Sequence, residues 1–168
     1  MKILILRYSS IGDIVLTTPV IRCVKQHVPN AEVHFATKEV FQEIVAYNPY
    51  LTKIHLLGKD TQAHIKSLKE EKFDLILDLH NNLRTKRIAW AIGVKSISFD
   101  KLNIQKYLLV NFKWNQLPNI HIVDRYLATA KTLGVKNDGL GLDYFYPPHF
   151  NNEKVLELVS PKVPYTAL

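Results

Sequence analysis

The feature that most constrains the fold is an alternation of short apolar runs with helical segments. The first run, Lys2 to Leu6, is continuously apolar after its first residue, which is typical of a strand buried on both faces of a parallel sheet. Four further strand-sized runs follow, and segments with helical spacing separate them. This order predicts an α/β fold: a Rossmann-like, doubly wound parallel sheet with helices on both faces.

The boundaries of the elements follow from periodicity and from helix-ending residues. Gly93 and Gly134 are expected to end two of the later helices, and Thr61 to cap an earlier one. Pro19 leaves two alternatives open in the first helical stretch: a kink, or a new helix that Thr18 caps. The segment 101–114 is ambiguous. The expected strands are 2–6, 31–36, 54–57, 73–79 and 94–99. The expected helices are one that ends near 27, then 39–46, one from the cap at 61 to about 72, 83–92 and 121–133.

Composition limits the classes of function. No apolar run reaches the roughly 18 residues that a membrane span needs, and the N-terminal run is too short for a signal peptide. The single cysteine, Cys23, excludes an internal disulfide, and we expect it in the core of a cytoplasmic protein. The net charge of +7 favours an anionic partner, although a solvated basic surface is the alternative.

Part of this charge is concentrated in one stretch. Between residues 84 and 106, Asp100 is the single acid among six basic residues, Arg84, Lys86, Arg87, Lys95, Lys101 and Lys106. No nucleic-acid-binding module is recognisable, so we expect no nucleic-acid partner. The aromatic residues in and near this stretch are interpreted as core residues: Trp90, Phe99, Tyr107, Phe112 and Trp114.

The loop after the first strand carries the clearest candidate for chemistry. Gly12 either allows a ligand to approach the backbone or adopts a positive φ. Asp13 follows at the start of a helix, where free amides attract anions and the dipole favours an ionised carboxylate. Asp13 is therefore either a general base at the mouth of the sheet or simply a complement to the helix dipole.

The loop after the fourth strand is the second candidate. Arg84 and Arg87 are three residues apart, so they share a helix face and could hold a phosphate or carboxylate. Asp78 and His80 are either a metal-binding pair or, as we favour, a hydrogen-bonded structural pair. Later in the chain, Arg125 faces either the surface or an acceptor.

Several familiar motifs are missing. Gly12 is the only glycine before Gly58, so the dinucleotide fingerprint and the phosphate-binding loop of nucleotide hydrolases are both absent. The chain has no His-Glu-x-x-His pattern and no Gly-x-Ser-x-Gly elbow. These absences argue against a nicotinamide dehydrogenase, a P-loop ATPase, a zinc protease of that motif and a serine hydrolase.

The opening segment, KILILRYSSIGDIVLTTPV at 2–20, resembles glycosyltransferase family 9, the ADP-heptose:lipopolysaccharide heptosyltransferases. Later segments resemble the family in the same order: FDLILDLHNNLR at 73–84, VDRYL at 123–127 and LGV at 133–135. The resemblance covers roughly residues 1–148. It implies the N-terminal half of a GT-B fold, in which two Rossmann-like domains face each other across a cleft.

The resemblance also implies an activity. A heptose would pass from ADP-heptose to a lipopolysaccharide inner-core acceptor, with inversion, and without a metal or cofactor. The family's catalytic aspartate falls on Asp13. The implied substrate-binding residues are Ser9, Ser10, Gly12, His80, Asn82, Arg84, Arg87 and Arg125. One departure is His80-Asn81-Asn82, which stands where a Gln-Gly pair is expected and implies a different acceptor.

The resemblance sets the expected domain organisation and partners. Residues 1–150 would form an acceptor-side domain, and 151–168 a linker with the start of a truncated donor-binding domain. The partners would be a nucleotide-sugar donor and a lipid-linked anionic glycan, in the cytoplasm with peripheral contact at the inner face of the inner membrane. The alternative function is a non-catalytic binding module for phosphorylated glycans or other anionic ligands.

Overall fold

The computed structural model describes residues 1–115 and 118–147, and these form a single five-stranded sheet with helices on both faces. The strands lie in the order β3-β2-β1-β4-β5, and every neighbouring pair is parallel. Their bounds are Lys2–Leu6 for β1, Glu32–Lys38 for β2, Lys53–Leu57 for β3, Leu75–Asp78 for β4 and Ser96–Ser98 for β5. The prediction of a doubly wound parallel α/β fold is therefore confirmed.

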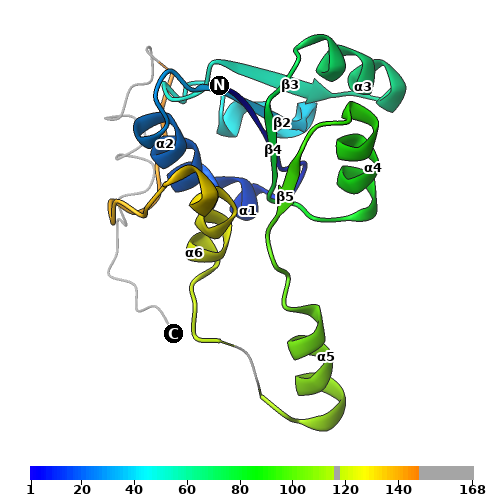
Figure 1. The fold of residues 1–168 in the computed structure, drawn as a ribbon, viewed down its shortest axis with the longest axis vertical. Helices are drawn as coiled ribbons and strands as arrows, with labels where there is room; N and C mark the ends of the chain where they lie inside the picture. Colours follow the sequence, from blue (N-terminus) through cyan, green and yellow to red (C-terminus); the bar gives the residue numbers. More distant parts are fainter. Residues whose placement is uncertain (116–117, 148–168) are drawn as a thin grey trace, which may run out of the picture.

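The helices form a layer on each face of the sheet (Figure 1). One layer holds α2 and α6, and the other holds α3 and α4, while α1 lies at the end of β1. The helices are α1 Ile11–Val15, α2 Thr18–His27, α3 Thr61–Glu70, α4 Leu83–Ile92, α5 Asn103–Phe112 and α6 Ile122–Leu127, with 3-10 helices η1 Glu39–Ile44 and η2 Ala128–Leu133.

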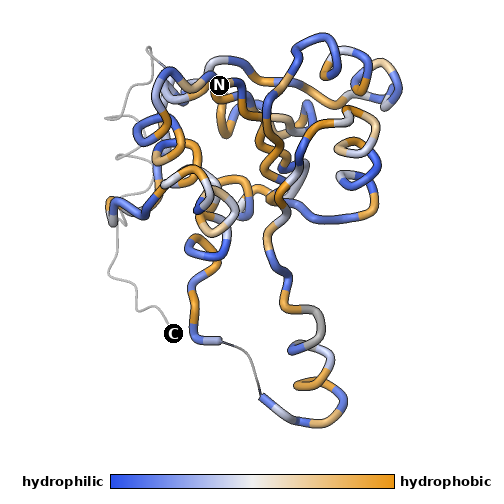
Figure 2. Tube along the Cα trace, in the orientation of Figure 1, coloured by the Kyte–Doolittle hydropathy of each residue, from blue (hydrophilic) through white to orange (hydrophobic). Residues whose placement is uncertain are grey.

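Each face of the sheet has its own hydrophobic core, because side chains alternate along the central strand β1. Ile3 and Ile5 pack on the side of α2 and α6, whereas Leu4 and Leu6 pack on the side of α3 and α4. All four side chains are fully buried. Figure 2 shows that the hydrophobic residues gather in the centre of the sheet. Cys23 lies in the first of these cores, as predicted.

Several boundaries differ from those predicted. The first helical stretch divides between Val15 and Thr18, so Pro19 lies near the start of a new helix whose cap position is Thr17. Asp60, one residue before the predicted Thr61, caps α3 by accepting bonds from two backbone amides. The predicted helices 39–46 and 121–133 are wholly or partly 3-10. The ambiguous segment 101–114 contains α5.

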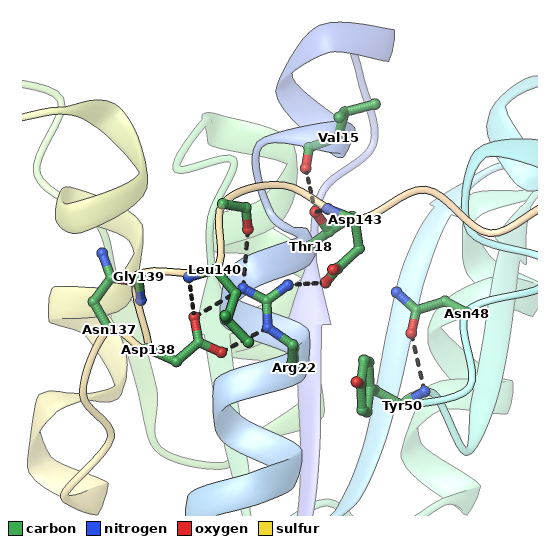
Figure 3. Close-up of polar contacts among 11 residues, drawn as sticks. Val15, Thr18, Arg22, Asn48, Tyr50, Asn137, Asp138, Gly139, Leu140 and Asp143 are labelled. Carbon is green, nitrogen blue, oxygen red and sulfur yellow. Dashed lines mark hydrogen bonds and ion pairs between the residues drawn. The ribbon is translucent and has the colours of Figure 1, made fainter.

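A buried arginine attaches the last part of the described chain to α2 (Figure 3). Arg22 donates to both carboxylate oxygens of Asp138, at 2.7 and 2.9 Å, and to the Gly141 carbonyl at 2.9 Å. A further hydrogen bond joins Arg22 to Asp143, whose amide is held by the Thr18 hydroxyl at 2.9 Å. The segment from Asp138 to Asp143 is thus fixed across α2. The predicted linker and donor-domain start, 151–168, lie outside the described residues.

The prediction for the aromatic residues is mostly wrong. Phe99 is buried, as predicted, but Trp90, Tyr107, Phe112 and Trp114 are all exposed. Three of them lie on α5 or just after it, and α5 projects away from the sheet instead of covering it (Figure 1). Within the described residues, no helix is both long enough and apolar enough to cross a membrane.

Candidate active site

The two loops singled out from the sequence meet at the carboxyl edge of the sheet. From β1 the chain builds outward to β2 and β3, then returns to add β4 and β5 on the other side. The switch point of such a sheet lies between β1 and β4, where ligands bind in open α/β folds. The Leu79 amide donates to the Leu6 carbonyl at 3.1 Å, and Arg7 donates to the Leu79 carbonyl. The loops after β1 and β4 are therefore joined.

Asp13 lies in the first turn of α1, above this switch point. Ser10 is the cap residue of the helix, and its backbone amide and hydroxyl donate to Asp13 Oδ2 at 3.3 and 3.1 Å. Arg7 Nη2 forms an ion pair with the same oxygen. The other oxygen, Oδ1, has no hydrogen bond among the described residues, and the side chain is 40% exposed. One face of the carboxylate is fixed, while the other is open to a ligand.

The electrostatic surroundings favour the ionised form of Asp13. Partial burial acts to raise the pKa of the carboxyl group, and it is the largest single effect. The Arg7 guanidinium and the two bonds from Ser10 act together in the opposite direction and outweigh it, so the pKa lies below its ordinary value. At neutral pH, Asp13 is a carboxylate that can accept a proton but has none to donate.

Arg7 is the functional residue to which the sequence analysis gave no role. It is buried, donates to the carbonyls of Ser9 (2.7 Å) and Leu79, and pairs with Asp13. Its guanidinium also lies 5.7 Å from the centre of the Tyr126 ring. The available signal was a charged residue directly after the apolar run from Ile3 to Leu6, a position where burial without a partner is costly.

The loop after β4 is organised by Asp78. Its carboxylate is fully buried and accepts from the amides of His80 (3.0 Å) and Asn81 (2.8 Å) and from the Thr85 hydroxyl (2.8 Å). Asn82 caps α4 by accepting from the Thr85 amide at 2.9 Å. The hydrogen-bonded alternative for Asp78 and His80 is therefore confirmed, with the backbone of His80 as the donor.

His80 lies at the edge of the switch point with its ring half-buried. Its ring centre is 6.4 Å from that of Tyr8, and its Nδ1 atom is buried without a hydrogen-bond partner among the described residues. Burial is the main cause that lowers the pKa of His80, and the nearby charges of Arg7 and Lys101 add to it. The imidazole is thus neutral near pH 7 and can donate or accept a hydrogen bond.

The remaining candidate residues are less closely grouped. Gly12 is exposed, has no positive φ, and a Cβ there would meet no atom, so of its two predicted roles only ligand approach remains. Arg84 and Arg87 are exposed on α4. The charge of Arg84 acts to lower the pKa of Tyr8, against the larger effect of burial, which raises it. Arg125 is half-buried: it donates to the Asp100 carbonyl and lies 5.8 Å from the centre of the Phe99 ring.

One group of side chains elsewhere has the composition of a metal site. Ligand atoms of His34, His55 and Glu71 lie within 4.8 Å of one another on the α3 side of the sheet. However, His34 Nδ1 and His55 Nε2 are hydrogen-bonded at 2.9 Å, and the Glu71 carboxylate is paired with Lys2 at 3.2 Å and with Lys53. These ammonium groups already neutralise the carboxylate, so we assign no metal to this group.

Comparisons with known proteins show which proteins this chain is similar to in sequence and in fold. No protein-family model matches the sequence. Lipopolysaccharide heptosyltransferase 1 of Campylobacter coli is 25% identical over 186 aligned residues, which cover 99% of this chain and 52% of that protein. The crystal structure of a family 9 glycosyltransferase from Veillonella parvula has a TM-score of 0.63 at 22% identity, over 86% of this chain and 46% of its own. The structure of the Escherichia coli heptosyltransferase WaaC with ADP has a TM-score of 0.66 at 20% identity, and the match covers 86% of this chain and 50% of that one.

These comparisons confirm the resemblance to the heptosyltransferases. The homologues are glycosyltransferases, and the solved structures share the α/β fold of this chain at identities that speak for the fold alone. The sheet corresponds to part of a GT-B architecture, as the resemblance implied. The chain spans about half the length of the curated relative it matches over 99% of its residues.

Proposed function

We propose that this chain is the acceptor-side half of an inverting heptosyltransferase, which transfers heptose from ADP-heptose to a lipopolysaccharide inner-core acceptor. The observation that carries the proposal is the Asp13 carboxylate at the switch point, with Oδ2 held by Arg7 and Ser10 and Oδ1 open. The curated relatives, which are lipopolysaccharide heptosyltransferases, support the substrate class.

The proposed reaction needs one base and no metal. As an acceptor hydroxyl oxygen attacks the anomeric carbon of the heptose, Asp13 Oδ1 accepts the hydroxyl proton. The bond from the anomeric carbon to ADP breaks on the opposite face, which inverts the configuration. A carboxylate of lowered pKa is a weak base, but the hydroxyl becomes acidic as its new bond forms. The open space beside Gly12 is where we place the donor diphosphate.

The acceptor side is assigned to the polar residues around the same edge. His80 and Asn82 end the loop after β4, while Arg84 and Arg87 extend along the exposed face of α4. We propose that these residues, with Ser9, Ser10 and Arg125, bind the sugar hydroxyls and anionic groups of a lipid-linked glycan. Because a lipid-linked acceptor is anchored in the inner membrane, we propose that the enzyme acts from the cytoplasm and contacts the surface of that membrane peripherally.

The test is transfer activity in the full-length protein with ADP-heptose and a lipid-linked acceptor. Replacing Asp13 with Asn keeps the size of the side chain but removes the base, so kcat should fall by about 10²- to 10⁴-fold. The KM for ADP-heptose should change little. Asp60→Asn is the matched control: it caps α3, where Asn serves almost equally well, and it should retain full activity. Equal activity of Asp13→Asn and Asp60→Asn would remove Asp13 from the mechanism.

A further inference from the structure

The helix α5 is the most conspicuous unpartnered element of the described chain. It leaves the carboxyl end of β5, extends away from the sheet, and the chain then returns toward α6 (Figure 1). Residues 103–115 are called the arm below. It covers neither of the two hydrophobic cores, and no described residue of the arm belongs to them.

The arm presents large apolar side chains to solvent. Tyr107 is 61% exposed, Val110 78%, Phe112 66% and Trp114 59%. The rings of Tyr107 and Phe112 contact each other at 6.2 Å, so part of this surface forms a continuous aromatic patch. Figure 2 shows the same contrast, a hydrophobic stretch on a segment that projects from the body. A patch of this kind on a monomer marks an interaction surface.

The charge around this patch has one sign. The sequence between Asp100 and Asp124 contains no acidic residue but three lysines, Lys101, Lys106 and Lys113. Lys113 directly precedes Trp114 and is exposed. Segments that combine lysine with Tyr, Trp and Phe bind at the headgroup level of a bilayer. The aromatic rings enter the interface there, and the ammonium groups contact anionic lipid.

We propose that the arm docks the protein on an anionic membrane surface, with Tyr107, Val110, Phe112 and Trp114 in the headgroup region and Lys113 against lipid phosphates. This inference rests on the proposed function in one respect: that function requires a lipid-linked acceptor, and the arm begins at the same sheet edge as Asp13. A bound membrane would then lie on the side of the molecule where the acceptor must enter.

Three other occupants of the arm are weighed: a second copy of the chain, the proposed second domain of the same protein, and a separate protein partner. The unbroken positive charge disfavours a second copy, because two arms would bring like charges together. A second domain or a protein partner would need an acidic, apolar groove. An anionic bilayer satisfies both the charge and the aromatic residues at once, so we commit to it.

The experiment uses the two tryptophans as reporters, because the chain has only Trp90 and Trp114. In Trp90→Phe, the remaining emission comes from the arm; in the matched Trp114→Phe, it comes from α4. Both are titrated with phosphatidylglycerol vesicles and with phosphatidylcholine vesicles, without donor or acceptor. We expect a blue shift for Trp90→Phe with the anionic vesicles alone, and little change for Trp114→Phe. Unchanged emission from Trp114 would overturn the proposal.

Affinity variants separate the arm from the rest of the surface. Val110→Ser should weaken vesicle co-sedimentation about tenfold, because it removes an inserted apolar side chain. Lys113→Ala should weaken it about fivefold. Val40→Ser is the control, since Val40 is 79% exposed on η1, and it should bind normally. Equal binding by Val110→Ser and Val40→Ser would contradict the arm as the docking site, as would arm-dependent dimerisation without lipid binding.

The vesicle assay is independent of sugar transfer. Asp13→Asn should bind vesicles as well as the unmodified chain, whatever its effect on activity. Failure of heptosyl transfer with intact vesicle binding would contradict the proposed function and leave the docking surface in place. Active transfer with no vesicle binding would support the proposed function and contradict the docking surface.

Discussion

At the scale of single residues, Asp13 is best understood together with Arg7. Asp13 Oδ2 receives the Arg7 guanidinium and two donors of Ser10, so the orientation of the carboxylate is fixed before any ligand binds. Arg7 in turn is held by carbonyls of the loops after β1 and β4. The arrangement leaves Oδ1 without a hydrogen-bond partner among the described residues and keeps the group ionised at neutral pH.

This coupling predicts a change in the pH dependence of transfer. Ser10→Ala removes one donor to Asp13, and Arg7→Met removes the positive charge, so both should raise the pKa of the Asp13 carboxyl toward its ordinary value. Because the base must be ionised, the acid limb of kcat/KM should move to higher pH, further for Arg7→Met. The measurement is kcat/KM against pH for the full-length enzyme.

Arg7→Met also breaks structural bonds, so its thermal unfolding must be recorded alongside. Ser10 is exposed, and Ser10→Ala therefore separates the electrostatic effect from loss of structure. An acid limb that stays in place in a folded Ser10→Ala protein, and also in Arg7→Met, would show that Asp13 is not the group being titrated.

The sequence predicted Asp13 as the candidate base, but it did not predict that Arg7 pairs with it. A helix-start acid after a buried strand has a recognisable pattern, and the family motif points to it as well. Which buried cation would face it depends on how the seven residues after β1 turn, and no periodicity encodes that. The prediction that the aromatic residues of α5 are buried was wrong for a different reason. Large rings are usually buried, but a single sequence does not show that a helix projects away from the rest of the domain.

At the scale of elements, α2 is fastened to the segment 138–143 by Arg22. Charges removed from water are costly unless well paired, and Arg22 satisfies this with Asp138, Asp143 and a carbonyl. The Arg22 hydrogen bond is the main cause that lowers the pKa of Asp138. The ion cluster around Arg22 therefore helps to hold the chain beyond η2 against α2 (Figure 3).

We predict that Asp138→Asn lowers the free energy of unfolding by about 1–3 kcal/mol, because Arg22 loses a charged partner but keeps Asp143. The pKa of Asp138 is lower folded than unfolded, so its contribution is complete above its unfolded pKa and is lost as pH falls through the folded value. Urea unfolding at neutral and at acidic pH measures both effects. The destabilisation by Asp138→Asn should shrink toward acidic pH.

Glu43→Gln is the matched control, since Glu43 is an exposed carboxylate on η1. It should unfold like the unmodified protein at both pH values. A neutral-pH midpoint for Asp138→Asn equal to that of Glu43→Gln would mean that the cluster adds nothing to stability.

The elements themselves were largely predictable, and their ends less so. The helix Leu83–Ile92 was predicted to the residue from its apolar spacing and its glycine end, whereas the capping role of Asn82 appears only in the structure. The segment 39–46 was predicted as a helix and is a short 3-10 helix, because apolar spacing does not distinguish i+3 from i+4 bonding over six residues. At α3, Asp60 and Thr61 are both good caps, and only the backbone shows which one is used.

At the scale of the whole molecule, the alternation of strands and helices predicts a parallel sheet, and the structure gives its strand order. Consecutive parallel strands joined by right-handed crossovers build outward from β1 in both directions, and this places the site at the centre of the sheet. The location of the candidate site was thus predictable from topology. The proposed division of labour between two domains was not predictable from topology, because it rests only on the family resemblance.

That division predicts how this chain behaves alone. If the donor binds mainly to another domain, the 168-residue chain offers ADP-heptose only the edge around Gly12 and Asp13, and calorimetry should give a Kd weaker than about 1 mM. The full-length protein should bind at least a hundredfold more tightly and should transfer heptose, whereas the chain alone should not.

The opposite result would be equally informative. Micromolar binding of ADP-heptose by the isolated chain would place the donor site on this sheet and contradict the acceptor-side assignment. Tight binding of a phosphorylated glycan, with no transfer even by the full-length protein, would favour the binding module instead. Gly12→Ala provides the internal control: a Cβ there meets no atom of the protein within 4 Å, so a weaker Kd would report a ligand that approaches α1 closely.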